Sequence, residues 1–204
     1  MEVVSNMMDA PSNLNQRIAE RVCELRTKQN LSLDALARKT GVSRSMISLI
    51  ERAECSPTAV VLEKLAAGFG VMLASLFDAQ AKKQESRYHV VRFKDQPQWR
   101  DPDSGYVRRN VSPPGLPELG QIVEVRFPAK ARIHFESSPR GSHMHQQVWV
   151  LGGAMEIGVG EERHLLHKGD CLAMQLDQPV TFHNPTSKPA HYAVVMVSET
   201  PSKR

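Results

Sequence analysis

The sequence predicts a multidomain fold, with an all-α amino-terminal domain joined to an all-β carboxy-terminal domain. Three observations predict this division. Apolar residues recur at helical spacing through residues 12–77. Beyond residue 88 short runs of alternating apolar and polar residues take over, with turn residues between them. Between the two, Asp78–Arg87 contains no large apolar residue, which is typical of a linker.

The chain length agrees with two domains. With 204 residues, the chain is long enough for each domain to bury its own core. We place the helical domain at 12–77, the linker at 78–88 and the β domain at 89–200. Residues 1–11 lack a periodic apolar face, and we expect them to be disordered.

The first predicted helix covers Asn13–Gln29. Leu14, Ile18, Val22 and Leu25 follow one another at steps of four, four and three residues, which places them on one face. This helix therefore contributes one apolar stripe to the core of the domain.

Residues 31–58 predict two short helices that meet at a tight turn. Ser32 is placed to cap the first helix, and Gly41 can take the left-handed conformation that ends it. Ser43 then caps a second helix, which sorts its residues onto two faces. Its core face contains Met46, Ile47 and Ile50, and its outer face contains Ser45, Ser48, Leu49 and Arg52.

Two further helices complete a five-helix domain. Ser56-Pro57 starts the fourth, because proline is tolerated at a first helical position, and Gly68–Gly70 ends it. We expect its buried face to contain Val60, Val61, Leu62, Leu65 and Ala66. A last short helix, Met72–Phe77, covers the bundle.

The pattern S-x3-L-A-x3-G-V-S-x3-I-S-x-I-E-R, followed by S-P-T, resembles the helix-turn-helix of the phage-repressor-like Xre family. The resemblance covers about residues 12–77 and implies a lambda-repressor-like DNA-binding domain. In that family the second helix of the pair lies in the major groove, where each base pair presents a distinct set of donors and acceptors. The alternative interpretation is a helical bundle that binds no nucleic acid.

The resemblance assigns a role to each residue of the outer face. Arg44, Ser45, Ser48 and Leu49 are implied to read bases, with Leu49 suited to a thymine methyl group. Ser32 and Arg52 are implied to contact the DNA backbone. The full set of candidate DNA-binding residues is Ser32, Ser43, Arg44, Ser45, Ser48, Leu49 and Arg52.

The charge distribution favours a homodimer on DNA. The net charge is +4 and the isoelectric point about 9.1. Residues 1–80 nevertheless contain nine Lys or Arg against nine Asp or Glu, so the helical domain is neutral. Since affinity from phosphate neutralisation is then modest per chain, we expect a dimer that reads a pseudo-palindromic operator.

The sequence predicts a cytoplasmic protein. The first residues carry no basic flank followed by an apolar core, so no signal peptide is evident, and no apolar run is long enough for a membrane span. The three cysteines, Cys23, Cys55 and Cys171, are odd in number and widely spaced, which favours reduced thiols.

The carboxy-terminal half predicts an all-β sandwich or barrel, because it contains many short strands separated by turns. The predicted strands are Tyr88–Phe93, Gln121–Phe127, Val148–Leu151, Met155–Val159, His164–His167, Cys171–Met174 and His191–Val197.

Residues Gln121–Val197 resemble the cupin family of jelly-roll barrels. Gly169 and Asn184 stand at the spacing of the second cupin motif, G-x5-P-x-G-x2-H-x3-N, but Val180 occupies its histidine position. The first motif is represented by His143 and His145, without a carboxylate at the matching position. The resemblance implies a β-barrel that holds a small ligand.

These departures argue against a metal cofactor. His143 and His145 would point to the same side of a strand, into the barrel, but two ligands do not complete a metal site. We therefore expect His143, His145, Gln147 and His183 to bind an organic ligand, with Arg132 and Trp149 as further lining residues.

Two functions remain open. In the first, the chain is a transcriptional regulator whose barrel senses a small metabolite and modulates operator binding. In the second, it is a non-haem metal enzyme of the epoxidase or dioxygenase kind with a vestigial helix-turn-helix. The enzyme needs a carboxylate ligand that the first motif lacks, and the second helix keeps a polar outer face. We favour the regulator, without enzymatic activity.

Overall fold

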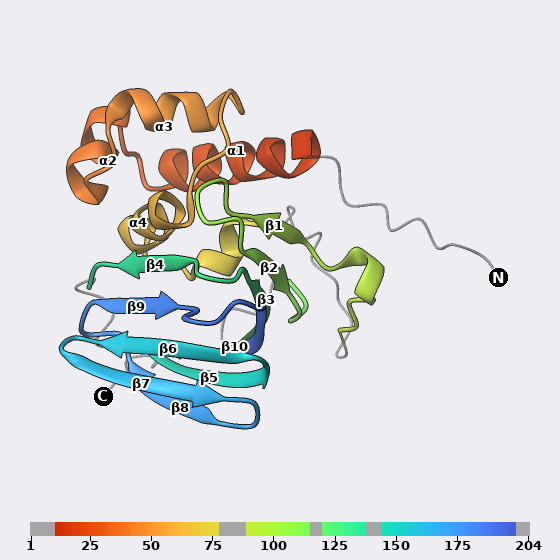
Figure 1. The fold of residues 1–204 in the computed structure, drawn as a ribbon. Coiled ribbons are helices and arrows are strands. Elements are labelled where there is room, and N and C mark those ends of the chain that lie inside the picture. The colour runs from red at the N-terminus through yellow and green to blue at the C-terminus, as the bar shows by residue number, and fades with distance from the viewer. Residues whose placement is uncertain (1–10, 78–88, 115–119, 138–143, 199–204) are drawn as a thin grey trace, which may run out of the picture.

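The computed structural model describes residues 11–77, 89–114, 120–137 and 144–198. The predicted linker, residues 78–88, lies outside the described residues, and so do residues 1–10 of the predicted disordered segment. Helices lie at one end of the molecule and strands at the other, with α4 over β4 (Figure 1).

The helical domain contains four α-helices in the described residues. They are α1 (Pro11–Lys28), α2 (Leu33–Thr40), α3 (Arg44–Glu51) and α4 (Ala59–Phe69). The prediction of five α-helices is wrong, because the expected last helix is a 3-10 helix, η1 (Leu73–Leu76). This segment is too short for the hydrogen bonds from residue i to i+4 that an α-helix repeats.

Side-chain caps fix where the short helices begin. The hydroxyl oxygens of Ser32, Ser43 and Thr58 accept hydrogen bonds from backbone N–H groups in the first turns of α2, α3 and α4. Helix α4 thus starts after Ser56-Pro57, slightly later than the sequence predicts. Gly41 ends α2 at φ 70°, the left-handed conformation predicted for it.

The core of this domain is apolar and closed. Leu14, Ile18, Val22 and Leu25 of α1 are all buried, as their spacing predicts. Contributions from the other helices, η1 and the intervening turns complete it: Leu36, Val42, Ile47, Ile50, Ala59, Leu62, Leu65, Ala66, Phe69, Leu73, Leu76 and Phe77.

The β domain is a two-sheet jelly-roll barrel. Its six-stranded sheet has the order β1-β2-β3-β10-β5-β8, and its four-stranded sheet has the order β4-β9-β6-β7. All the pairings are antiparallel. The strands are β1 (Gln98–Arg100), β2 (Val107–Asn110), β3 (Gln121–Phe127), β4 (Arg132–Phe135), β5 (Met144–Gly152), β6 (Ala154–Val159), β7 (Glu162–His167), β8 (Cys171–Gln175), β9 (Val180–His183) and β10 (Ala190–Ser198).

Most predicted strands are present, with two kinds of error. The prediction of a strand at Tyr88–Phe93 is wrong over its described part, where residues 89–92 are irregular and Phe93 opens a short 3-10 helix, η2 (Phe93–Asp95). Strands β1, β2, β4 and β9 were not predicted, because each has only three or four residues and three of them contain arginine.

A chain of aromatic rings joins the two domains. Phe77, at the end of the helical domain, lies 5.8 Å from Trp99 of β1, measured between ring centroids. Trp99 contacts Tyr106, Tyr106 stacks on Phe127, and the series continues inside the barrel to Tyr192, Phe182 and Phe135. The apolar core of the barrel is therefore continuous with that of the helical domain.

Polar contacts also cross between the domains. The Asp101 carboxylate accepts a hydrogen bond from Ala59 N at 2.8 Å, at the start of α4, and Asn110 Nδ2 donates to Ala74 O at 3.0 Å. Lys64 of α4 forms an ion pair with Glu136 at 3.0 Å. These contacts and the ring chain give the helical domain a defined orientation on the barrel.

Candidate functional site

Helix α3 presents one buried face and one open face, as its sequence predicts. Ile47 and Ile50 are buried, and Arg44, Ser45 and Arg52 are exposed. Ser48 and Leu49 are half-buried at the border of the open face. The open face therefore combines cationic, hydroxyl and apolar groups, the types that contact phosphates, base edges and thymine methyl groups.

Two candidate DNA-contacting serines act as helix caps in the free protein. Ser32 Oγ accepts from Ala35 N at 3.1 Å, and Ser43 Oγ accepts from Met46 N at 3.2 Å. Ser43 Oγ also lies 3.1 Å from Ser45 Oγ. Both hydroxyls lie at a helix amino terminus, where anions such as a phosphate are favoured.

Both arginines of the open face are held by acidic residues. Arg44 Nε lies 3.4 Å from Asp34 Oδ1, and Arg52 Nε lies 2.8 Å from Glu54 Oε1. Arg52 also bonds Ser48 Oγ. Its hydrogen bond with Glu54 raises the pKa of Arg52 and lowers the pKa of Glu54. A DNA phosphate must compete with these carboxylates, which are solvent-exposed and so hold the arginines weakly.

A partly buried ion pair fixes α3 against α1. Arg26 Nε and Nη2 donate to the two carboxylate oxygens of Glu51, at 2.7 and 2.8 Å, and Arg26 Nη1 donates to Leu31 O at 3.0 Å. The side chains of Arg26 and Glu51 are only 17% and 11% exposed. This ion pair joins the late part of α1 to the end of α3, and it orients the open face of α3.

The expected ligand-binding residues of β5 do not point into the barrel. His145 and Gln147 are exposed, whereas Gln146, Val148 and Val150 between and beyond them are buried. Successive side chains of a strand point to opposite faces, so the prediction of an inward His145 is wrong by one position. His143, the other member of the expected pair, lies outside the described residues.

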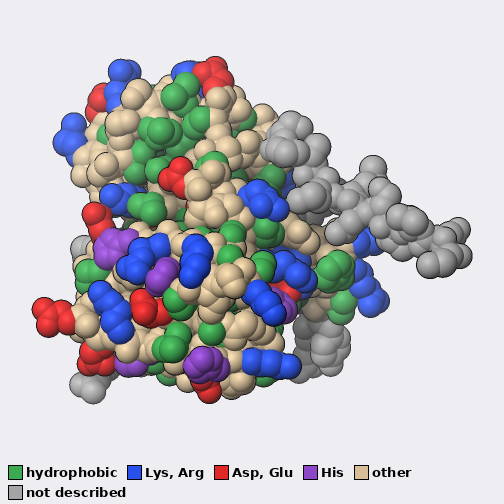
Figure 2. All heavy atoms as spheres, viewed as in Figure 1, with side chains coloured by type: hydrophobic (Ala, Val, Ile, Leu, Met, Phe, Trp, Pro, Cys, Tyr) green, Lys and Arg blue, Asp and Glu red, His purple; other side chains and the backbone are tan. Residues whose placement is uncertain are grey.

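His183 lies on the outer face of the other sheet. Its Nδ1 is 3.2 Å from Glu156 Oε1 and 3.2 Å from Arg132 Nη2, and Arg132 is largely exposed. Figure 2 shows lysine, arginine and histidine side chains gathered over this four-stranded sheet. His145 and His183 therefore belong to the outer surfaces of two different sheets. Trp149 is also on an outer surface, with 51% of its side chain exposed.

Two inward positions of the described strands are Gln146 on β5 and Val180 on β9, and Val180 occupies the histidine position of the second cupin motif. Asn184, which matches the pattern, is fully buried and bonds the backbone carbonyls of Phe127, Pro128 and Lys188. Its role in this chain is to hold turns together.

A polar cluster that the sequence did not reveal lies inward, at the end of the barrel next to the helices. Arg108 of β2 is only 8% exposed and lies beside Tyr106, Trp99 and Tyr192, all of them buried. Burial lowers the pKa of Arg108, and the nearby Tyr106 and Glu63 oppose that shift. The only signal in the sequence was the alternation of faces along a strand: Arg108 is at one of the inward-facing positions of Val107–Asn110.

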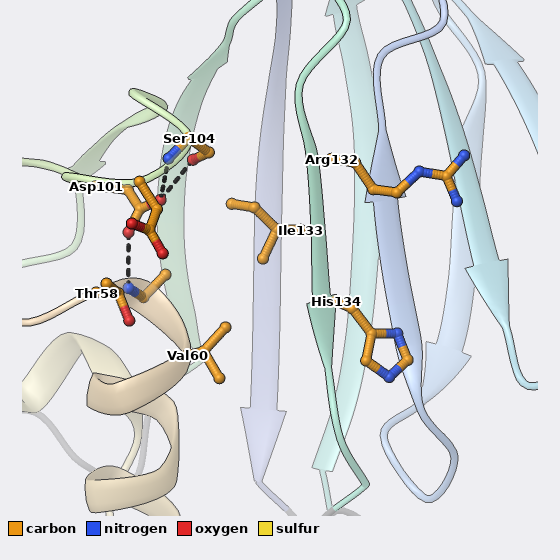
Figure 3. Close-up of a pocket in the computed structure, with 9 residues that line it drawn as sticks. Thr58, Val60, Asp101, Ser104, Arg132, Ile133 and His134 are labelled. Carbon is orange, nitrogen blue, oxygen red and sulfur yellow. Dashed lines mark hydrogen bonds between the residues drawn. The ribbon is translucent and has the colours of Figure 1, made fainter.

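A cavity of about 230 Å³ lies between the domains, lined by the start of α4, the turn after β1 and strand β4. The Asp101 carboxylate caps α4 here, and its other oxygen accepts from Ser104 N and Oγ at 2.8 and 2.6 Å (Figure 3). Ile133 points toward the Asp101 side of β4, while Arg132 and His134 point away from it. The Asp101 side chain, which is only 2% exposed, therefore joins the two domains through its carboxylate.

Comparison with known proteins agrees with this architecture. Residues 24–76 match the helix-turn-helix family model HTH_3. The HTH-type transcriptional regulator SutR of Escherichia coli (strain K12) is 23% identical over 193 residues, covering 88% of this chain and 94% of the relative. The regulator PuuR of the same organism is 26% identical over 168 residues, covering 81% and 86%.

A solved structure shares the whole fold. The crystal structure of an HTH_3 family transcriptional regulator from Vibrio cholerae superposes with a TM-score of 0.75 at 24% identity. The match covers 94% of this chain and 100% of that one. Within the described residues, none of the helices has the length and apolar character needed to cross a membrane.

Proposed function

Residues 24–76 form a helix-turn-helix domain of the HTH_3 family, and from this premise we propose that the chain is a sequence-specific DNA-binding transcriptional regulator. The observation that carries the proposal is α3. It is capped by Ser43, oriented by the Arg26–Glu51 pair, and leaves Arg44, Ser45, Ser48, Leu49 and Arg52 on its open face. A single helix with such a face fits the major groove.

The roles of the open face follow from its chemistry. Arg44 and Ser45, in the first turn of α3, are placed to reach base edges, and Ser48 and Leu49 extend that contact by one turn. Arg52 and the capping hydroxyls of Ser32 and Ser43 contact phosphates. Relatives named as transcriptional regulators that align over most of their length support this assignment.

The regulator works as a homodimer. The neutral helical domain gives one copy few phosphate contacts, and a second copy doubles them. The outer face of the six-stranded sheet offers an apolar surface for that second copy: Ile122, Trp149 and Val197 are 43%, 51% and 46% exposed on strands β3, β5 and β10. Exposed apolar residues gathered on one face are typical of association surfaces.

The barrel is the sensor domain, and it binds an organic effector without a metal. Within the described residues, the inward positions Gln146 of β5 and Val180 of β9 are not imidazoles, which supports a site without a metal. Its direct contacts to α4 and η1 mean that a ligand held in the barrel acts on the helical domain. The chain is a regulator rather than an enzyme, and it acts on DNA in the cytoplasm.

The test is selection of bound sequences from a pool of random duplex DNA by the purified full-length chain. The proposal expects enrichment of an inverted repeat whose half-sites are one helical turn apart, as two copies of α3 in successive major grooves require. If no sequence is enriched over the starting pool, the chain is not a sequence-specific DNA-binding protein.

A further inference from the structure

Two buried hydrogen-bond donors face each other across β1 and β2. Trp99 and Arg108 are direct partners in the register of these strands, and they are 3% and 8% exposed. Within the described part of the chain, neither Trp99 Nε1 nor Arg108 Nη2 has a hydrogen-bond acceptor. Buried polar groups in native proteins are nearly always bonded, so two adjacent unbonded donors indicate that an acceptor belongs there.

The surroundings of the two donors define the kind of acceptor. A guanidinium is a fixed fork of donors with a permanent positive charge, and an indole N–H is a pure donor. A carboxylate satisfies both, because its two oxygens can accept from the two donors and its negative charge complements the guanidinium. Tyr106 and Tyr192, buried on either side of Arg108, add flat walls that suit the apolar part of a small molecule.

Arg108 is also connected to the helical domain at two points. Its Nε donates to Asn110 Oδ1 at 3.4 Å, and Asn110 Nδ2 donates to the backbone oxygen of Ala74 in η1. The second connection is electrostatic. Glu63, on α4, has its pKa raised by burial, and the attraction of Arg108 counters that shift. Glu63 is therefore an acidic neighbour of Arg108 in the helical domain.

We propose that Arg108 and Trp99 form the effector site of the barrel and that the effector is a small carboxylate bound by the Arg108 guanidinium and the Trp99 indole N–H. This deepens the proposed function, since it rests on the barrel being a sensor, and it names the ligand class and the coupling. A bound carboxylate shifts Arg108 relative to Asn110, whose amide holds the backbone oxygen of Ala74 in η1. The position of η1, and of α4 that packs against it, on the barrel changes as a result.

The experiment uses Trp99 as its own reporter. The chain has two tryptophans, and Trp149 is on the outer surface, so the full-length Trp149→Phe variant leaves Trp99 as the only fluorophore of this type. Sodium acetate and sodium butyrate are titrated into it without DNA, with sodium chloride at equal ionic strength as the reference. We expect a saturable change in Trp99 emission with either carboxylate and none with chloride.

Three further variants in the same background identify the residues. Arg108→Gln should weaken carboxylate binding roughly tenfold or more, because it removes a charged hydrogen bond. Arg126→Gln removes an exposed arginine from the neighbouring strand β3 and should leave binding unchanged. Glu63→Gln should tighten binding several-fold, because it removes a nearby negative charge that disfavours a bound anion. A purely structural Arg108 gives no reason for that tightening.

Each outcome decides the proposal. No saturable response to acetate or butyrate, equal binding by Arg108→Gln, or weaker binding by Glu63→Gln overturns it. If Arg108→Gln does not fold, as judged by circular dichroism, the Glu63→Gln titration alone decides. Because no DNA is present, failure here leaves the DNA-binding proposal standing, and failure to select an operator leaves this result unaffected.

Discussion

At the scale of single residues, the open face of α3 is a balance of charges rather than a uniformly basic surface. Asp34 and Glu54 hold Arg44 and Arg52 in exposed ion pairs. Such pairs contribute little stability, so the arginines can exchange a carboxylate for a DNA phosphate at small cost. The carboxylates also repel the DNA backbone, which keeps binding to random sequence weak.

Removing either acid should therefore strengthen binding to DNA of any sequence. We expect Asp34→Asn and Glu54→Gln each to improve the affinity for random duplex DNA modestly at low salt and less at high salt. Fluorescence anisotropy across a salt series measures this. Glu161→Gln, an exposed acid in the turn of the barrel between β6 and β7, is the control and should change nothing. Weaker binding by Asp34→Asn would show that the carboxylate positions Arg44 for DNA.

The Arg26–Glu51 pair is expected to contribute more than a surface ion pair, because both side chains are largely buried and joined by two short hydrogen bonds. A double-mutant cycle of Arg26→Ala and Glu51→Ala should give a coupling free energy of about 1–3 kcal/mol in chemical denaturation of the full chain. The less buried pair Arg21–Glu24, whose side chains are 25% and 39% exposed, is the comparison. Equal coupling in the two pairs would remove the proposed role in orienting α3.

The sequence predicted the residues of α3 well and those of the barrel poorly. A helix of eight residues shows its buried face through the spacing of Ile47 and Ile50, and every other position follows from the helical angle. On β5, a shift of one residue exchanges the two faces. The sequence from His145 to Val150 did not show which alternate residues face the interior, so His145 was predicted inward and Gln146 was overlooked.

At the scale of elements, α4 is the helix that joins the domains. Its first backbone amide is capped from the barrel by Asp101, its own Thr58 caps the next turn, and Lys64 reaches Glu136. Sequence patterns predicted this helix, but no local pattern reveals a cap supplied from 42 residues away along the chain. Short strands such as β1 and β2, which carry that cap, were missed for the same reason: long-range pairing stabilises them, not local preference.

Replacement of Asp101 should loosen the domains as well as destabilise them. Asp101→Ala leaves the Ala59 N–H and two Ser104 donors without an acceptor, and we expect a loss of about 1–3 kcal/mol in the free energy of unfolding. Calorimetry should show the single transition broaden or split. Asp103→Ala, an exposed neighbour in the same turn, is the control. A sharp transition that is merely shifted to lower temperature would argue against a role for the cap in coupling the domains.

At the scale of the whole molecule, the two domains share one continuous core. The ring series from Phe77 through Trp99 and Tyr106 to Phe127 begins in the helical domain and ends in the barrel. Arg108, which lies beside Trp99 and Tyr106, is therefore close to both domains. The domain division was evident from the change of periodicity along the chain, but this contact between the domains was not, because its residues are far apart in sequence.

The proposed dimer surface can be tested by placing a charged side chain on it. Trp149→Glu places a carboxylate among the exposed apolar residues of β3, β10 and β5, and we expect it to give a monomer in sedimentation velocity. Leu165→Glu alters a residue that is 55% exposed on the opposite sheet and should leave the dimer intact. If Leu165→Glu dissociates the dimer and Trp149→Glu does not, the second copy docks on the four-stranded sheet.

The central claim, that α3 reads DNA sequence, is tested most directly by the ratio of affinities for a selected operator and for random duplex DNA. The account predicts that Arg44→Ala lowers operator affinity by about 1–3 kcal/mol and reduces this ratio, with discrimination lost at one base-pair position in each half-site. Arg163→Ala, which removes an exposed arginine from β7, should leave both affinities unchanged. An unchanged ratio in Arg44→Ala, together with unchanged discrimination at every position, would contradict the account.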